Sequence, residues 1–196
     1  MFKEISKVNR MLVGLSGLLL VAVYFLPLWQ ITISAPQYPD ALGLNIWIDK
    51  ITGMNEFDLM NINLLNHYIG MKEIDENSII ELQYMPYILY FMIFGAIVTF
   101  IFDRLVMVYL GVINSVIVFI AGLYDFWRWE YDYGHNLDPN APISMPGMTY
   151  QPPLIGCKTI LNIDACSMPH FGGWLLIIMM GLLVYILYKE KKEIAS

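Results

Sequence analysis

Four stretches of the chain contain no Asp, Glu, Lys or Arg, and they alternate with segments that hold every charge. The stretches are 23, 21, 20 and 18 residues long and cover residues 11–33, 82–102, 105–124 and 171–188. About 20 apolar residues in a helix cross the hydrocarbon core of a bilayer. The pattern therefore predicts four transmembrane helices, of which the second and third form a tight antiparallel hairpin.

The composition supports this interpretation. Of the 196 residues, 58% are hydrophobic and 14% are charged, whereas about 25% of the residues of a soluble domain are charged. These values exclude a soluble globular domain and a disordered chain. The net charge of −6 also argues against a nucleic-acid-binding protein, because such domains are strongly basic.

The basic residues set the expected orientation. Residues 1–10, 103–104 and 189–196 hold seven Lys and Arg against four Asp and Glu, whereas residues 34–81 and 125–170 hold four against thirteen. Cytoplasmic loops carry an excess of Lys and Arg. We therefore expect a multi-pass protein of a bacterial inner membrane with both termini in the cytoplasm and two acidic extracytoplasmic segments.

The two outer segments are 48 and 46 residues long and rich in apolar residues, too long to be simple connections. We expect them to pack together into a small cap. Six of the ten prolines lie in the second segment, and they exclude a helix through its middle. The predicted fold class is all-α, a four-helix transmembrane bundle with two long extracytoplasmic segments that form a small cap.

Within the first outer segment the spacing predicts a helix. Asn55 can cap a helix that begins at Glu56, and Gly70 is placed to end it. A second helix is expected from Asp75 into the following span. Apolar residues at steps of three or four residues predict the packed face of the first helix: Phe57, Met60, Leu64 and Tyr68.

Soft ligands gather in the outer segments, which hold all three histidines, both cysteines and six of the thirteen methionines. Thioether, thiolate and imidazole groups suit Cu(I). The competing interpretation is ordinary packing, because methionine is frequent throughout the chain and the spacing matches no fixed metal motif. The candidate copper ligands are His67, Met71, Met148, Met168 and His170.

Cys157 and Cys166 leave two interpretations open, a structural disulfide on the oxidising side of the membrane or a free pair available to a metal. A quinone-linked thiol oxidoreductase is rejected because it needs a more closely spaced reactive pair and a second pair for exchange. The segment Trp127–Glu130 favours an interfacial aromatic anchor over a haem site. Glu130, Asp132 and Asp138 can in principle pair as acid and base, but acidic solvated loops are far commoner, and no catalytic motif is present.

Three strings of sequence carry a family resemblance: Leu65-Asn-His-Tyr-Ile-Gly-Met71, Tyr133-Gly-His-Asn-Leu-Asp-Pro139 and Pro146-Gly-Met148-x-Tyr-Gln-Pro-Pro-Leu-Ile-Gly156. The chain resembles the small four-span membrane proteins, called NosB in some cases, that are encoded in nitrous-oxide reductase gene clusters of the clade II type. The resemblance implies an accessory role in making, anchoring or supplying an extracytoplasmic copper enzyme that reduces nitrous oxide. It implies no catalytic residues.

The predicted function is a non-enzymatic accessory subunit whose cap docks an extracytoplasmic copper protein and whose helices anchor it in the lipid bilayer. The acidic outer surface favours a partner with a basic patch. Two alternatives stay open, a direct Cu(I) carrier that uses the outer His, Met and Cys residues, and a haem- or quinone-handling membrane protein. The residues expected to contact the partner are Tyr68, Tyr133, His135, Met145 and Gln151.

Overall fold

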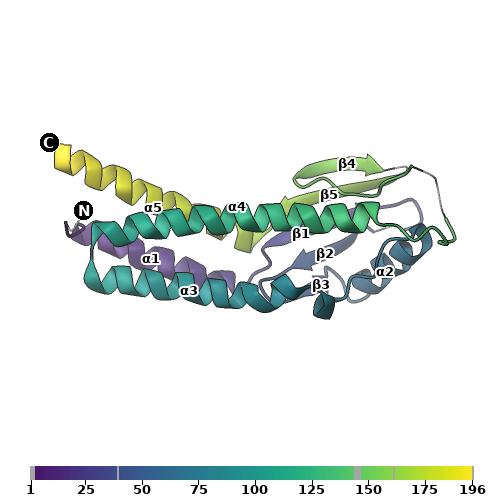
Figure 1. Ribbon diagram of the computed structural model, residues 1–196, viewed down its shortest axis with the longest axis horizontal. Helices are drawn as coiled ribbons and strands as arrows, with labels where there is room; N and C mark the ends of the chain where they lie inside the picture. The colour runs from purple at the N-terminus through teal and green to yellow at the C-terminus, as the bar shows by residue number, and fades with distance from the viewer. Residues whose placement is uncertain (1–2, 39, 144–146, 161, 196) are drawn as a thin grey trace.

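The computed structural model is an elongated molecule with long helices at one end and a five-stranded sheet at the other (Figure 1). It describes residues 3–38, 40–143, 147–160 and 162–195, with side chains described up to residue 193. The helices are α1 (Lys7–Val23), α2 (Asp58–Ile69), the short 3-10 helix η1 (Glu76–Ser78), α3 (Ile80–Phe102), α4 (Leu105–His135) and α5 (Phe171–Ala195). The strands are β1 (Trp29–Ser34), β2 (Leu42–Ile46), β3 (Ile51–Gly53), β4 (Gly156–Ile160) and β5 (Ile163–Pro169).

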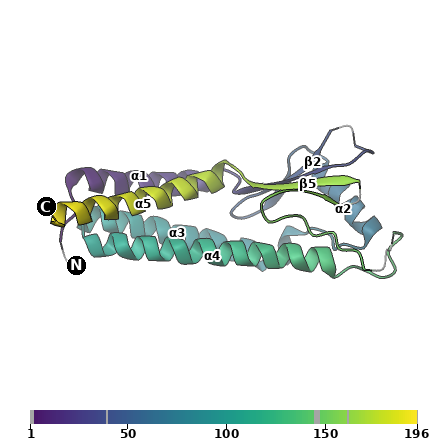
Figure 2. The ribbon, with the colours of Figure 1, turned by 90° about the horizontal axis from the view of Figure 1, so that it is seen from above.

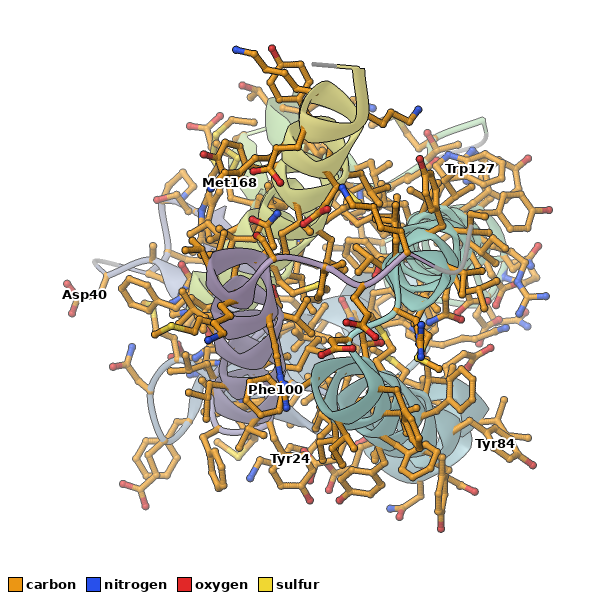
Figure 3. The ribbon with its side chains drawn as sticks, turned by 90° about the vertical axis from the view of Figure 1, so that its left-hand side faces the viewer. Tyr24, Asp40, Tyr84, Phe100, Trp127 and Met168 are labelled. Carbon is orange, nitrogen blue, oxygen red and sulfur yellow. A yellow bond between two sulfur atoms is a disulfide. The ribbon has the colours of Figure 1, made fainter. Side chains whose placement is uncertain are left out.

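Helices α1, α3, α4 and α5 lie side by side, and both chain termini are at the end farthest from the sheet (Figures 1 and 2). Helix α1 packs against α3 and α5, and α4 packs against the same two helices. Seen along the helices, Tyr84 and Trp127 lie at the outer edge of the molecule (Figure 3). Large apolar side chains therefore lie on the outside of this end as well as in its core.

Three helices in the described part of the chain are long and apolar enough to span a membrane: α3, α4 and α5. They contain the predicted spans 82–102, 105–124 and 171–188. Helix α1 has 17 residues, a length of about 25 Å at 1.5 Å per residue, somewhat less than a hydrocarbon core of about 30 Å. A fourth membrane crossing, and with it the four-helix transmembrane bundle, stays a prediction.

The expected helix over residues 11–33 is wrong in its second half. Helix α1 ends at Val23, and residues Trp29–Ser34 form strand β1. Pro27 cannot donate a backbone hydrogen bond and disfavours helix in the preceding residue, so the helix does not continue through it. The β-branched residues beyond it alternate with polar ones, which is a strand pattern.

The all-α prediction is wrong for the cap, because a five-stranded antiparallel sheet forms there in the order β3-β2-β1-β5-β4. The central strand β1 pairs with β2 on one side and with β5 on the other, so that Trp29 lies opposite both Ile46 and Pro169. Paired residues of β1 and β5, which are 130 to 140 positions apart in sequence, thus become neighbours. We use the name cap for this sheet together with α2, η1, residues 125–135 of α4 and the connection to β4.

Helix α4 runs from the helical end of the molecule into the cap. Its 31 residues extend about 46 Å, more than the hydrocarbon core requires. We therefore take residues 105–124 as the membrane-spanning part and residues 125–135 as an extension that packs in the cap. In the described residues between His135 and Gly156 there is no helix or strand, so the described part of the proline-rich segment follows the irregular path that was expected.

Helix α2 ends where it was predicted to end, but it begins later. Gly70 adopts a left-handed conformation with φ of 79° and ends the helix. The helix begins at Asp58 rather than Glu56, and Asn55 does not act as its cap. Instead the buried Asp58 carboxylate accepts hydrogen bonds from the backbone N–H groups of Gly43 and Asn55, each at 3.0 Å, and ties the start of α2 to strand β2.

The opposite end of the molecule is fastened by polar contacts between the two ends of the chain. Glu190 on α5 is fully buried and accepts hydrogen bonds from the Ser6 backbone N–H and from Asn9 Nδ2, both at 2.7 Å. The Ile5 backbone N–H donates to the carbonyl of Asp103 in the α3–α4 turn at 2.8 Å. The N-terminal segment therefore joins α1 both to α5 and to the hairpin formed by α3 and α4.

Candidate functional site

The cap contains a partly open cavity of about 90 Å³ between the inner face of the sheet, helix α2 and the extension of α4. Strands β1 and β5 contribute aliphatic side chains to its wall, and α2 contributes a second aliphatic wall. Nearly all of the lining is apolar. The lining residues are Ile31, Ile33, Leu44, Ile62, Leu65, Asn66, Ile69, Met71, Ile74, Trp129, Glu130, Tyr133, Tyr150, Pro152, Ile160, Ile163 and Ala165.

One acidic side chain lines this cavity. Glu130 is 0% exposed, and neither of its carboxylate oxygens has a hydrogen-bond partner in the described part of the chain. Residues 126, 129, 130 and 133 share one helix face, and this face of α4 packs against the cap core. Burial in apolar surroundings raises the pKa of Glu130 to about 8, because the charged form loses its hydration.

A tight backbone contact holds a second polar group at the cavity. The Tyr150 backbone N–H donates to the Gly134 carbonyl at 2.9 Å. A Cβ added at Gly134 would lie 2.5 Å from backbone atoms of Gln151, so only glycine allows this approach. The contact places the Tyr150 side chain, which is buried and whose hydroxyl has no partner among the described residues, in the cavity wall.

Three of the predicted docking residues are buried or half-buried in the cap. Tyr133 is 8% exposed and its hydroxyl donates to the Glu73 carbonyl at 3.2 Å. Gln151 is half-buried against Gly134. His135 is also half-buried, and its ring stacks on Tyr131 with the centroids 3.9 Å apart. Met145 lies outside the described residues.

Helix α2 presents an apolar face to the outside. The residues predicted to form its packed face are exposed, whereas Ile62 and Asn66 on the other face are buried. Both faces follow apolar steps of three or four residues, so periodicity alone could not decide between them. Exposed fractions are 59% for Phe57, 62% for Met60, 49% for Leu64 and 45% for Tyr68.

The candidate copper ligands are not gathered in one place. His67 is exposed on α2, which lies at the far end of the cap, whereas His170 directly precedes α5, which begins where the sheet meets the helices (Figure 1). Met71 lines the cavity, and Met168 is exposed on β5. Met148 is half-buried in the irregular segment. In the described residues no three His, Cys, Asp or Glu side chains are grouped so as to hold a metal ion, and copper binding stays a prediction.

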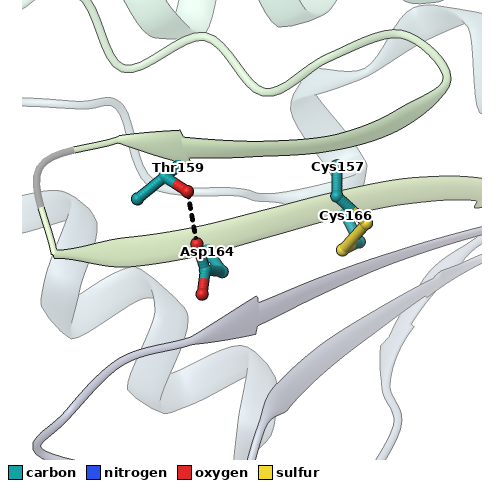
Figure 4. The surroundings of a disulfide bond; sticks show 4 residues. All are labelled: Cys157, Thr159, Asp164 and Cys166. Atoms are coloured by element: carbon teal, nitrogen blue, oxygen red, sulfur yellow. Dashed lines mark hydrogen bonds between the residues drawn. A yellow bond between two sulfur atoms is a disulfide. The ribbon is translucent and has the colours of Figure 1, made fainter.

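The cysteines form a disulfide, the first of the two alternatives. Cys157 and Cys166 face each other across the β4–β5 ladder with their Cα atoms 4.0 Å apart. Further along the same hairpin, Thr159 Oγ1 donates to Asp164 Oδ1 at 2.6 Å (Figure 4). The described chain therefore leaves no free thiol for a metal.

The three carboxylates considered as an acid–base group have different surroundings. Glu130 faces the cavity, whereas Asp132 lies on the outside of α4 and accepts a hydrogen bond from Lys72 Nζ at 2.6 Å. This hydrogen bond lowers the pKa of Asp132, and Asp138 is exposed. The burial of Glu130 was not predicted from the sequence, although the spacing of Phe126, Trp129 and Tyr133 around it could have indicated it.

Comparisons with protein-family models, with curated proteins and with solved structures find no match to this chain. Function is therefore inferred below from the residues of this chain and their geometry.

Proposed function

We propose that the chain is a non-enzymatic accessory protein of a bacterial inner membrane. Its cap lies outside the cytoplasm and docks, anchors or helps to mature an extracytoplasmic copper enzyme of the nitrous-oxide reductase type. The observation that carries this proposal is that the sequence segments on which the family resemblance rests, residues 65–71, 133–139 and 146–156, contact one another. The Asp138 backbone N–H donates to the Gly70 carbonyl at 2.8 Å, and the Tyr150 N–H donates to the Gly134 carbonyl at 2.9 Å.

These contacts join the ends of α2 and α4 and the irregular segment into one unit at the outer end of the cap. The Ile143 N–H also donates to the Tyr68 carbonyl at 2.9 Å. Residues that the resemblance singles out in separate parts of the sequence thus share one surface region. Surface segments held in a fixed shape by a stable scaffold are typical of binding sites.

Two features support a cap on the outer side of the membrane. The Cys157–Cys166 disulfide is of a kind that persists in oxidising compartments and is rare in the cytoplasm. Both termini lie at the end farthest from the cap (Figure 1), and the segments at that end carry most of the Lys and Arg residues. This distribution follows the positive-inside rule.

The exposed apolar face of α2 is the proposed docking surface, formed by Phe57, Met60, Leu64 and Tyr68. His67 is exposed on the same helix. The outer segments hold thirteen acids against four Lys and Arg, and two of these acids, Asp58 and Glu130, are buried. The remaining acidic surface favours a partner with a basic patch beside an apolar contact area, because complementary charge speeds association and fixes orientation.

Co-purification from membranes tests this proposal. Tagged full-length protein is purified in mild detergent from cells that express the copper enzyme, and the bound enzyme is quantified by immunoblot and copper content. We expect Leu64→Asp to reduce recovery at least tenfold. Ile155→Asp is the matched control, because Ile155 is 58% exposed and precedes β4 at the opposite edge of the sheet.

Absence of the enzyme from the wild-type preparation, or equal recovery with Leu64→Asp, contradicts the docking proposal.

The copper-carrier alternative predicts a different result with the same preparation. Titration with Cu(I) against a competing chelator would then give tight stoichiometric binding that is lost in a His67→Ala, Met71→Ala double variant. A haem- or quinone-handling protein would instead give visible absorbance or extractable quinone.

A further inference from the structure

The strongest unexplained feature of the molecule is the unpartnered carboxyl group of Glu130. The large majority of buried side-chain polar atoms in proteins have a hydrogen-bond partner. Glu130 is 0% exposed and has none among the described residues, and it forms no ion pair there. The group lines a cavity, so an occupant of that cavity can supply the missing partner.

The cavity walls narrow the chemistry of such an occupant. The described lining contains no Lys or Arg, and Glu130 is its one acidic side chain. The aromatic side chains of Trp129, Tyr133 and Tyr150 line the same space, and aromatic ring faces attract cations. A single carboxyl group among aromatic and aliphatic side chains favours a cation that carries an apolar body, and it disfavours anions.

The size of the cavity limits the body of the ligand. An apolar cavity of 150 Å³ accommodates benzene, with six heavy atoms. By the same proportion a cavity of about 90 Å³ accommodates roughly four heavy atoms. We propose that the Glu130 cavity is a binding site for a small alkylammonium ion, with its nitrogen at the Glu130 carboxylate and its carbons against Ile62, Leu65 and Ile163.

This site would show a defined pH dependence. The pKa of Glu130 is about 8, and a cation requires the ionised form. The other titratable side chains of the described lining are Tyr133 and Tyr150, while α2 and the strands contribute none. Burial raises the pKa of Tyr133 above its ordinary value, so this phenol stays neutral over the range in which Glu130 ionises. Affinity should therefore rise about 25-fold from pH 6.5 to 8.5 as Glu130 ionises.

Calorimetric titration of the purified full-length protein in detergent tests the proposal. The probe is n-propylammonium, and 1-propanol is an uncharged control of the same number of heavy atoms. We expect saturable one-to-one binding of n-propylammonium, at least tenfold weaker binding of 1-propanol, and at least tenfold weaker n-propylammonium binding to Glu130→Gln. Glu56→Gln, at an exposed position outside the cavity, should bind the probe like wild type.

Other outcomes overturn the proposal. No saturable binding at pH 8.5 would mean that water alone occupies the cavity. Equal binding of propanol and n-propylammonium, or unchanged binding to Glu130→Gln, would reduce the site to a generic apolar cavity. The pH arm uses the wild-type chain and so does not depend on the variant folding. None of these results bears on enzyme docking, since that is measured separately by co-purification.

Discussion

Replacing Glu130 by Gln should make the protein more stable and remove a pH dependence. The carboxyl group is buried without a partner, and its pKa rises from 4.5 to about 8 in the folded protein. In the unfolded chain the same group ionises near pH 4.5. Between these two values the unfolded state binds fewer protons than the folded state, so the contribution of Glu130 to stability falls as the pH rises.

The magnitude follows from the two pKa values. Each unit of difference corresponds to about 1.4 kcal/mol, and integration from pH 5 to pH 7 gives a loss of about 2.5 kcal/mol for wild type. Glutamine has nearly the same shape and does not titrate. The free energy of unfolding of Glu130→Gln relative to wild type should therefore increase by about 2.5 kcal/mol over this range.

Unfolding curves followed by tryptophan fluorescence in mild detergent at pH 5, 6 and 7 measure this difference. For a chain of this length, 2.5 kcal/mol corresponds to a relative shift of the midpoint of roughly 5–10 °C. The Glu56→Gln variant is the control, because this exposed acid should leave the pH dependence of wild type unchanged. Parallel pH profiles for wild type and Glu130→Gln would refute the inference that the buried carboxyl group is protonated at neutral pH.

Two further predictions concern the fold of the cap. Gly134→Ala should lower the free energy of unfolding by about 1–3 kcal/mol, because the new Cβ would lie 2.5 Å from the backbone of Gln151. Its control Gly122→Ala lies on the same helix with no atom within 4 Å, and a lower midpoint for this control than for Gly134→Ala would contradict the reasoning. Replacing Cys157 and Cys166 by Ser should cost about 2–3 kcal/mol, since the disulfide closes a loop of about ten residues. An unchanged midpoint, with the wild-type bond verified by non-reducing mass spectrometry, would contradict a structural role for the disulfide.

The three long apolar helices could be predicted because they depend on a local property. A contiguous apolar run long enough to cross a bilayer is helical wherever it occurs, since the chain must satisfy its own backbone hydrogen bonds in lipid. The runs 82–102, 105–124 and 171–188 satisfy this condition, and all three are helical. The same reasoning extended the first run too far. It counted apolar residues beyond Pro27 without regard to their alternation.

The cap could be predicted only in part. Gly70 was recognised as a helix end because its left-handed conformation is a local requirement. The outward face of α2 was misassigned, since Leu59, Ile62 and Leu65 repeat at the same interval as the exposed apolar residues. The sequence offered two equivalent faces, and contact with strand β2 determined which one became buried.

By itself, the sequence determined the three apolar helices, the irregular proline-rich segment and the distribution of charge between the two ends of the molecule. The tertiary structure alone decided that β1 pairs with β5, that the cysteines bond to each other, and that Glu130 faces a cavity rather than water. The physical reason is that crossing a membrane depends on the composition of one segment. Strand pairing and burial depend instead on partners from distant parts of the chain, and a local sequence pattern does not identify those partners.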